Sequence, residues 1–275
     1  MGAVILLLII GFSGCTEFRR DNGNEEGGVP TAEIIVSRLL ETIDEISSYK
    51  YSADVAVTKT MINATTTNTT EITAMQNGEV DIINKKLCQN NTGMEGYKSQ
   101  HWIVYIINNF QYSGTETNGI ISWTNYNTSH TNATMTWNAY DVLEGIKLFF
   151  KQDYLDSLDN YTIEQLQDDS LSNVKCYVLQ VTTSYENKTG DDGGSFSMPG
   201  NISQHTETTL WIAKETYRLM KTYSSSTSES TGWYAFGYPD VEQSLISQKM
   251  EVLFYDYDIP IIIELPPEAE HNQFP

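Results

Sequence analysis

The feature that most constrains this fold is the repeated alternation of apolar and polar residues over stretches of strand length. After residue 50, Tyr51, Ala53, Val55 and Val57 alternate with polar or small residues. A period of two residues places the two sets on opposite faces of a β-strand, one of them buried. The same kind of signal predicts further strands at residues 71–75, 79–87, 100–107, 110–114, 119–126, 174–184, 206–213, 217–224, 247–257 and 259–265.

Residues that favour turns separate several of these strands. Asn77-Gly78 and Asn108-Asn109 tolerate a positive φ angle, so both pairs are predicted to form hairpin turns. Residues 186–200 and 224–240 are rich in Gly, Ser and acidic side chains and are predicted to be long loops.

Two segments show helical rather than strand spacing. Apolar residues from Ile35 to Ile46 recur every three or four positions, which predicts an amphipathic helix over 31–48 with Thr31 as its N-cap. A second helical run covers residues 137–158, and Thr162 is placed to cap a short helix that ends near residue 167. The order of helix, strands, helices and strands predicts an α+β fold, an antiparallel sheet with helices on one face.

Composition excludes one class of partner. The chain has 36 acidic and 16 basic residues, a formal net charge of −20, and a pI near 4.4. Proteins bind nucleic acid through clustered Lys and Arg, and this sequence has no such cluster. Nucleic acid is therefore excluded as an expected partner, and adhesion to an anionic membrane by charge is disfavoured.

The first fifteen residues resemble an export signal. Residues 3–12 are nearly all apolar and lead into Gly14 and Cys15, but about ten apolar residues are too few to span a bilayer, which takes about 20. A short apolar run that ends in small residues before a cysteine is typical of a lipobox, where cleavage leaves the cysteine to carry a lipid. The alternative is a plain cleaved signal in which Cys15 has no role.

These features predict four regions. We expect a signal peptide at 1–14, a lipid-anchored flexible tether at 15–30, one folded domain at 31–270 and a short tail at 271–275. The tether segment contains almost no apolar residues, so it cannot offset the entropy lost on ordering. The expected location is the outer face of the cytoplasmic membrane, with the chain exported and held by its lipid.

Two cysteines remain if Cys15 is lipidated. Disulfides form in exported proteins, so Cys88 and Cys176 are predicted to pair with each other. Such a bond closes a loop of about ninety residues and stabilises the fold by ~4 kcal/mol on the chain-entropy estimate. The alternative is two separate buried thiols.

The sequence also contains eight Asn-x-Ser/Thr sequons. In an exported chain several of them are expected to carry glycans, which places those asparagines on the solvent side. A lipobox together with many sequons is typical of an archaeal surface protein. The sequon asparagines are Asn63, Asn68, Asn90, Asn127, Asn132, Asn160, Asn187 and Asn201.

Several segments, in a fixed order, resemble the lipoprotein-carrier superfamily of the LolA, LolB, LppX and LprG type. The resemblance covers about residues 31–270 and rests on structural motifs, none of them a catalytic signature. This superfamily includes bacterial outer-membrane lipoprotein carriers and mycobacterial glycolipid-carrying lipoproteins, and archaeal surface lipoproteins share the pattern. The segments are 46–51 (ISSYKY), 77–81 (NGEVD), 102–112 (WIVYIINNFQY), 209–221 (TLWIAKETYRLMK) and 254–266 (FYDYDIPIIIELP).

The resemblance implies a strongly curved antiparallel sheet, an incomplete barrel whose concave face is covered by helices. It further implies an apolar cavity for acyl chains, because an open barrel too wide for its own side chains encloses space for a ligand. The alternative is an ordinary filled core. The candidate ligand-binding residues are Trp102, Val104 and Ile106 on a central strand and Leu143, Phe149 and Leu155 on the middle helix.

Catalytic and metal-binding patterns are missing from the sequence. It contains no Gly-x-Ser-x-Gly elbow, no phosphate-binding glycine loop, no Cys-x-x-Cys and no His-Glu-x-x-His. The single histidines His101, His130, His205 and His271 are too scattered to predict a metal site. No catalytic residue, metal or cofactor is therefore expected. Asp256 and Asp258 share one face of a predicted strand, where charges that end an edge strand are the favoured interpretation.

Three hypotheses follow. The first is a membrane-anchored protein that binds or carries a hydrophobic small molecule or acyl chain, such as a lipid, an isoprenoid or a lipidated protein. The second is a non-enzymatic cell-envelope glycoprotein that contacts other envelope proteins or glycans and holds no internal ligand. The third, a hydrolase, has little support because no catalytic group of residues was found.

Overall fold

The fold is a single twelve-stranded antiparallel sheet partly covered by helices. The computed structural model describes residues 30–95, 98–107, 110–127, 141–189, 200–231 and 242–270. The strands lie in the order β6-β5-β4-β3-β2-β1-β12-β11-β10-β9-β7, and β8 pairs with β9. Their bounds are β1 Ser48–Ile62, β2 Thr67–Asp81, β3 Lys86–Glu95, β4 Lys98–Ile107, β5 Phe110–Thr117, β6 Ile120–Asn127, β7 Asn160–Gln165, β8 Asp169–Leu171, β9 Val174–Thr189, β10 Gly200–Ala213, β11 Leu219–Thr231 and β12 Gln243–Tyr255.

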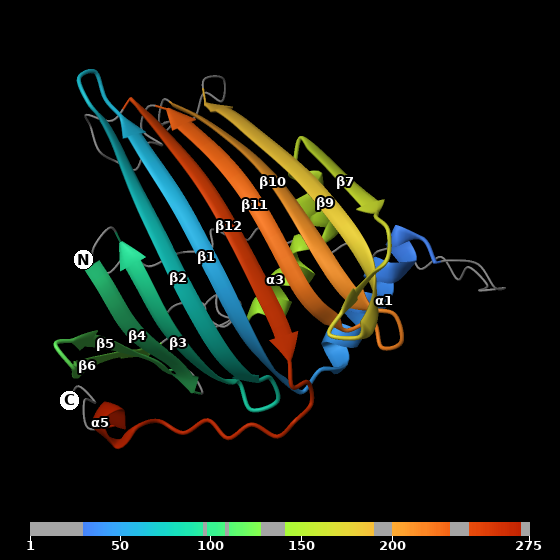
Figure 1. Ribbon diagram of the computed structural model, residues 1–275, viewed down its shortest axis with the longest axis horizontal. Helices are drawn as coiled ribbons and strands as arrows, with labels where there is room; N and C mark the ends of the chain where they lie inside the picture. The colour runs from blue at the N-terminus through green and yellow to red at the C-terminus, as the bar shows by residue number, and fades with distance from the viewer. Residues whose placement is uncertain are drawn as a thin grey trace.

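The helices lie behind the sheet in Figure 1, on one of its two faces. They are α1 Ala32–Glu45, α3 Val142–Phe149 and α4 Gln152–Asp156, and a short α5 Pro267–Glu270 lies near the other end of the sheet. We call the face covered by α1 and α3 the helix face and the opposite one the open face. The predicted α+β fold, a strongly curved antiparallel sheet with helices on its concave face, is confirmed.

Alternation along β1 explains how the sheet takes this arrangement. Tyr49, Tyr51, Ala53 and Val55 point to the helix face and are at most 5% exposed, whereas Asp54 and Ala56 are exposed. Burial of each large apolar side chain contributes about 1.5–3 kcal/mol relative to exposure. The apolar stripe therefore fixes which face of the strand meets the helices, and the register follows from it.

The first helix and the pairing of β4 with β5 follow the sequence prediction. Helix α1 begins after Thr31, as predicted, and its buried residues include Ile35, Leu39 and Ile43. The predicted hairpin at 108–109 joins β4 to β5, which pair antiparallel up to Ile107 and Phe110. Residues 108 and 109 themselves lie outside the described ranges.

The predicted turn at Asn77-Gly78 is wrong. Strand β2 runs unbroken through both residues, and the real turn lies between Asp81 and Lys86. Gly78 is opposite Tyr51 in the β1–β2 register, and a β-carbon at residue 78 would overlap the Tyr51 ring. The glycine is thus present to admit a large side chain from the next strand, not to form a turn.

Three other predicted elements differ from the structure. Residues 160–165 form strand β7 instead of a helix capped by Thr162, because they pair with β9 at the edge of the sheet. Strand β3 was missed beyond residue 87, where polar residues obscure the alternation. The predicted strand at 259–265 is an irregular segment. We call residues 256–266, which join β12 to α5, the strap.

The middle helical region is shorter than predicted. Within the predicted run 137–158, the described part forms α3 and α4, and residues 137–140 lie outside it. The predicted loops are shorter too, since β9, β10 and β11 extend into them, and residues 190–199 and 232–241 are not described.

The structure contradicts the predicted disulfide. Cys88 and Cys176 are both free. They lie on β3 and β9, which are six strand positions apart in the sheet. At about 4.8 Å per strand this separation is far beyond the ~7 Å limit between Cα atoms for a disulfide. The alternative, two separate thiols with Cys176 buried, describes the structure.

Candidate ligand site on the helix face

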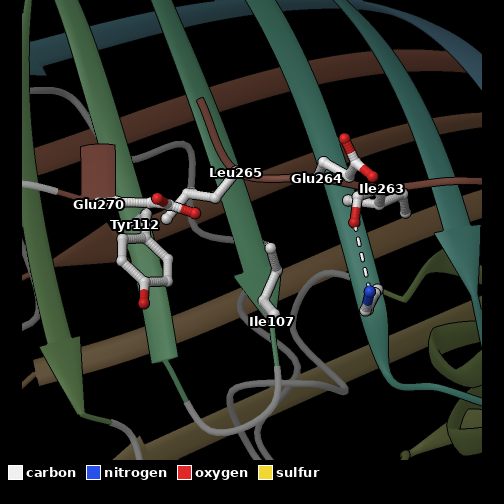
Figure 2. A pocket seen from close by; sticks show the side chains of 7 residues that line it. Ile107, Tyr112, Ile263, Glu264, Leu265 and Glu270 are labelled. Carbon is white, nitrogen blue, oxygen red and sulfur yellow. Dashed lines mark hydrogen bonds between the residues drawn. The ribbon is translucent and has the colours of Figure 1, made fainter. Parts of the chain in front are cut away.

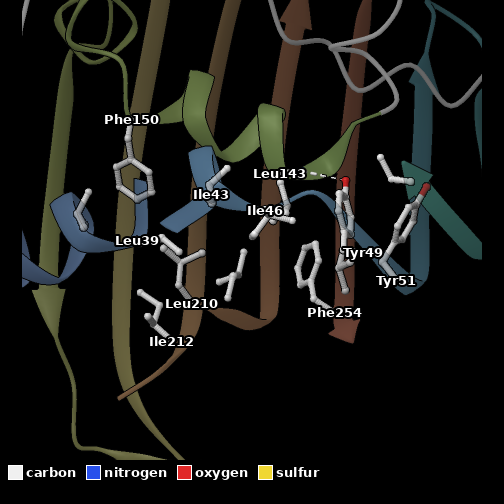
Figure 3. Packing of buried hydrophobic residues seen from close by; sticks show 14 of the residues in the cluster. Leu39, Ile43, Ile46, Tyr49, Tyr51, Leu143, Phe150, Leu210, Ile212 and Phe254 are labelled. Carbon is white, nitrogen blue, oxygen red and sulfur yellow. Dashed lines mark hydrogen bonds between the residues drawn. The ribbon is translucent and has the colours of Figure 1, made fainter. Parts of the chain in front are cut away.

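The strongest candidate site is the apolar layer between the helices and the sheet. It occupies the half of the helix face where β1 begins and β12 ends, which we call the near half. The far half is the part where β1 ends and β12 begins. Figure 3 shows side chains from α1, α3 and several strands meeting in this layer. Its fully buried members include Ile35, Leu39, Tyr49, Leu87, Leu143, Leu179, Leu210, Ile212 and Leu219, each 0% exposed.

A buried hydrogen-bonded pair joins α3 to the sheet. The hydroxyl of Tyr49 on β1 donates to Asp141 Oδ1 at 2.7 Å, and Asp141 is the N-cap of α3. The same carboxylate oxygen accepts from the backbone N–H groups of Leu143 and Glu144, at 3.1 and 3.2 Å. One carboxylate therefore both begins the helix and connects it to the sheet. We call Tyr49 and Asp141 the clamp.

Burial changes the acidity of both clamp residues. Desolvation raises the pKa of Asp141 above its usual range, although the hydrogen bond from Tyr49 and those from the α3 backbone oppose the change. Burial, followed by the nearby charge of Asp141, raises the pKa of Tyr49 well above its usual range. Tyr49 thus remains a hydrogen-bond donor across the physiological pH range.

Aromatic rings surround the sheet side of the clamp. The Tyr49 ring lies 6.2 Å from Tyr51, 6.1 Å from Phe254 and 6.3 Å from Tyr257, measured between ring centroids. These tilted pairs are typical of aromatic packing and contribute beyond the area they bury.

The six predicted ligand-binding residues all belong to the buried region, but neither hollow described below is lined by any of them. Val104, Ile106, Leu143 and Leu155 are at most 5% exposed, and Trp102 and Phe149 are partly buried against the core. Trp102, Val104 and Ile106 do share the helix face of β4, as predicted, and Leu143 lies on α3. In this conformation these side chains pack against protein, so a cavity is not shown.

The far half of the helix face has a different lining. On β11 every helix-face position from Thr222 to Ser230 is Ser or Thr, and neighbouring β12 presents Met250, Gln248 and Ile246. The buried Ser244 Oγ here has no hydrogen-bond partner among the described residues, and the same holds for Asn91 Oδ1 nearer the middle of the face. The sequence analysis missed this polar half of the helix face because both faces of β11 are polar, so β11 shows no alternation of apolar and polar residues.

The open face has a hollow beside the strap, shown in Figure 2, with a volume of about 710 Å³. Ile107 and Tyr112 line its sheet side, and the Lys86 ammonium donates to the Ile263 carbonyl at 3.4 Å across it. Its remaining lining comes from the strap and α5, through Ile263, Glu264, Leu265 and Glu270.

A second hollow, of about 740 Å³, crosses the far half of the open face. Most of the side chains that line it are polar and come from six strands, with hydroxyl groups such as Thr58, Ser203 and Thr227 beside His205 and Glu229, and Leu245 and Ile246 complete the lining. Within the described ranges no group of three or more His, Cys, Asp or Glu side chains is placed to hold a metal ion.

The carboxylates singled out in the sequence have structural partners. Asp258 forms an ion pair with Arg218 and accepts from the Ser47 backbone N–H at 2.8 Å. Burial acts to raise the pKa of Asp258, but these bonds outweigh it and lower the pKa. Asp256 lies 3.9 Å from the Lys50 ammonium.

The histidines that can be placed lie singly on the open face. The two ring nitrogens of His101 lie 2.7 Å from Glu116 and from Asn90, and His205 is 3.6 Å from Glu207. His130 and His271 fall outside the described ranges.

The sequon asparagines are mostly at the surface. Asn68, Asn90, Asn160 and Asn201 are exposed. Asn63 is half-buried, and its carboxamide oxygen accepts hydrogen bonds from the backbone N–H groups of Thr65 and Thr66. Asn132 lies outside the described ranges. Asn127 is the last residue of β6, and Asn187 lies near the end of β9. Glycosylation remains a prediction.

Comparison with known proteins finds likeness in structure but not in sequence. No family model matches the sequence, and no curated protein matches it. The fold is similar to the crystal structure of LprF from Mycobacterium bovis, at 13% identity and a TM-score of 0.40, over 86% of this chain and 96% of that one. A LolA superfamily protein from Nitrosomonas europaea gives 10% identity and a TM-score of 0.22, again over 86% and 96%. Scores this low support no conclusion about family or ligand.

No helix in the described ranges is long and apolar enough to cross a membrane.

Proposed function

We propose that this chain is an extracytoplasmic lipoprotein, anchored to the membrane, that binds or carries a hydrophobic ligand between its helices and its sheet. The observation that carries the proposal is the apolar layer of the near half. Its cover consists of short helices that touch the sheet through side chains and the clamp, with no strand pairing to hold them. The ligand is a lipid, an isoprenoid or the acyl chain of a lipidated protein.

Ligand entry requires α3 to move away from the sheet. The core between Leu143 and the sheet is filled, so a ligand must replace protein contacts with contacts of its own. Apolar burial stabilises by ~25 cal/mol per Å², so an acyl chain that buries several hundred Å² can bind without a charged anchor. The hydroxyl and amide groups of the far half are available to the polar end of the ligand.

The anchoring part of the proposal rests on the sequence. It assigns lipidation to Cys15 after removal of residues 1–14, a tether at 15–30, and the outer face of the cytoplasmic membrane as location. The exposed sequon asparagines support glycosylation on the solvent side. The proposed role is binding, without catalysis.

Uptake of a fluorescent fatty-acyl probe tests the binding proposal. Ala53 is 5% exposed on the helix face of β1, whereas Ala56 on the open face of the same strand is exposed. Ala53→Trp should weaken uptake at least tenfold because the indole takes the space that the ligand would occupy when α3 moves away from the sheet, and Ala56→Trp should leave uptake unchanged. Melting temperatures measured alongside distinguish lost binding from unfolding. Equal uptake by both variants, or none by the wild type, contradicts the proposal.

The second candidate is a cell-envelope glycoprotein with no internal ligand. Two observations favour it: the predicted lining residues are packed in the core, and the open face presents a polar hollow across six strands. In that case Ala56→Trp and substitutions around the hollow change partner binding, whereas the near half serves stability alone.

A further inference from the structure

Two segments far apart in the sequence meet at the near end of the sheet. They are the β2–β3 turn at 82–85 and the strap, and Figure 1 shows both at the same end of the strands. Both are held by backbone carbonyls at the start of β1, those of Ser47 and Ser48. The Ile82 N–H donates to the Ser47 carbonyl at 3.0 Å, and the Asp258 N–H donates to the Ser48 carbonyl at 2.9 Å. Backbone hydrogen bonds therefore hold both the turn and the strap to the start of β1.

Large apolar side chains project from this fixed backbone. Ile83 is 74% exposed, Ile259 is 50% exposed and Ile262 is 82% exposed. The Ser48 hydroxyl donates to the Ile259 carbonyl at 2.7 Å, which holds the strap where these side chains face outward. We call Ile83, Ile259 and Ile262 the rim. Exposed isoleucines at one end of a sheet are typical of a contact surface.

Charge narrows the choice of partner. The chain carries a net charge of −20, so attraction to acidic headgroups is not what brings the rim to a surface. The rim itself is apolar; Lys85 lies beside it in the turn and Lys86 is the first residue of β3, while Asp81 and Glu264 are acidic residues nearby in sequence. Apolar side chains flanked by lysines are the combination that enters the boundary between lipid headgroups and acyl chains.

The chain that precedes the described residues has the reach for this contact. Helix α1 leads from Pro30 to Ile46, so the rim lies roughly one helix length from Pro30, about 21 Å at 1.5 Å per residue. Fifteen residues of tether span at most about 50 Å when extended. A membrane attachment at Cys15 therefore lets the rim reach the bilayer without strain.

We propose that the rim seats the near end of the sheet in the interface of the membrane. Four of the sequon asparagines, Asn63, Asn68, Asn160 and Asn201, lie at the far ends of their strands or in the turn beyond them, and would then point away from the bilayer. This inference rests on the membrane anchoring in the proposed function, but not on binding of an acyl ligand.

The test places an environment-sensitive fluorophore at single introduced cysteines in the full chain. Ile83→Cys and Ile262→Cys report on the rim. Ile120→Cys is the matched control, because Ile120 is 70% exposed at the far end of β6. The unsubstituted protein, labelled in the same way, gives the background from its own cysteines. Phosphatidylcholine vesicles are used because they offer an interface without net charge.

We expect the emission at residues 83 and 262 to rise at least twofold and shift to the blue on vesicles, with no change at residue 120. Equal responses at all three positions, or none at the rim, overturn the inference. A rim response that needs protein concentration but no vesicles also overturns it, because it assigns the rim to a second copy of the chain. No acyl probe is present, so failure of ligand binding leaves this result unaffected.

Discussion

The two halves of the helix face differ although the same strands build both. In the near half β10 presents Leu210 and Ile212, both fully buried, and α1 and α3 pack on them. Further along the same strand the helix-face residues are Thr206 and Gln204. One half has the apolar area that stabilises a fold, and the other has hydrogen-bonding groups that add little to stability. Stability and polar recognition are thus separated along the length of each strand.

Truncation of matched residues on β10 gives the largest expected contrast. Leu210→Ala should lower the free energy of unfolding by about 2–5 kcal/mol, because it leaves a cavity in a filled core. Thr206→Ala, on the same face four residues earlier, should cost less than about 0.5 kcal/mol. Denaturant unfolding of both variants measures the difference. Similar losses at the two positions contradict the division into halves.

Glycines offer a smaller version of the same contrast. In the near half, Gly78→Ala places a methyl group in the Tyr51 ring and should cost about 1–3 kcal/mol through overpacking. In the far half, Gly93→Ala meets the Trp102 ring at 3.0 Å and should cost less, because that half-buried side chain has room to shift. The two midpoints of thermal unfolding measure this order. A larger loss at Gly93 would break the comparison.

The pH dependence of two carboxylates should have opposite signs. The pKa of Asp141 is raised in the folded protein, so its ionisation weakens the fold as pH rises from about 4, the value in an unfolded chain. The pKa of Asp258 is lowered, so its contribution is present above about pH 4 and is lost as pH falls through the folded value.

Asn substitutions keep the shape of both side chains and remove the titration. Relative to the wild type, Asp141→Asn should become more stable as pH rises above about 4, whereas Asp258→Asn should be less stable near neutral pH and approach the wild type in acid. Melting temperatures between pH 3 and about 8 give both curves. Parallel curves would show that burial at the clamp does not set the charge state of Asp141.

The cysteines carry the smallest expected effect. Both are free, on distant strands, so a reducing agent should leave the melting temperature unchanged. Thiol counting in denaturant should find Cys88 and Cys176 both reactive without prior reduction. A melting temperature that falls on reduction would show a bond that this structure does not contain.

The sequence predicted the parts of the fold where burial imposes a pattern. Helix α1 and strand β1 each have one buried face, and their periodicity was sufficient to assign both. Strand β3 was missed beyond residue 87 because its helix face carries Gln89 and Asn91, so neither face looks apolar. The turn at Asn77-Gly78 was wrong because the local signal for a turn cannot reveal that Gly78 faces Tyr51 on another strand.

The sequence predicted which residues share the face of the candidate site, but not whether they line a cavity or pack as a core. Apolar alternation placed Trp102, Val104 and Ile106 on one face, and the structure keeps them there. Whether such residues line a cavity or a core depends on how α3 packs, which no local pattern specifies. The clamp was also out of reach, since Tyr49 and Asp141 are 92 residues apart in the chain.

Native mass spectrometry of gently extracted full-length protein tests the central claim most directly. If the near half holds an apolar ligand, the wild type should carry one co-purifying lipid, released by collisional activation, and Ala53→Trp should carry less of it while melting as a folded protein. A wild type that shows only the mass of the chain with its covalent modifications, and that takes up no added fatty-acyl probe, would contradict the account.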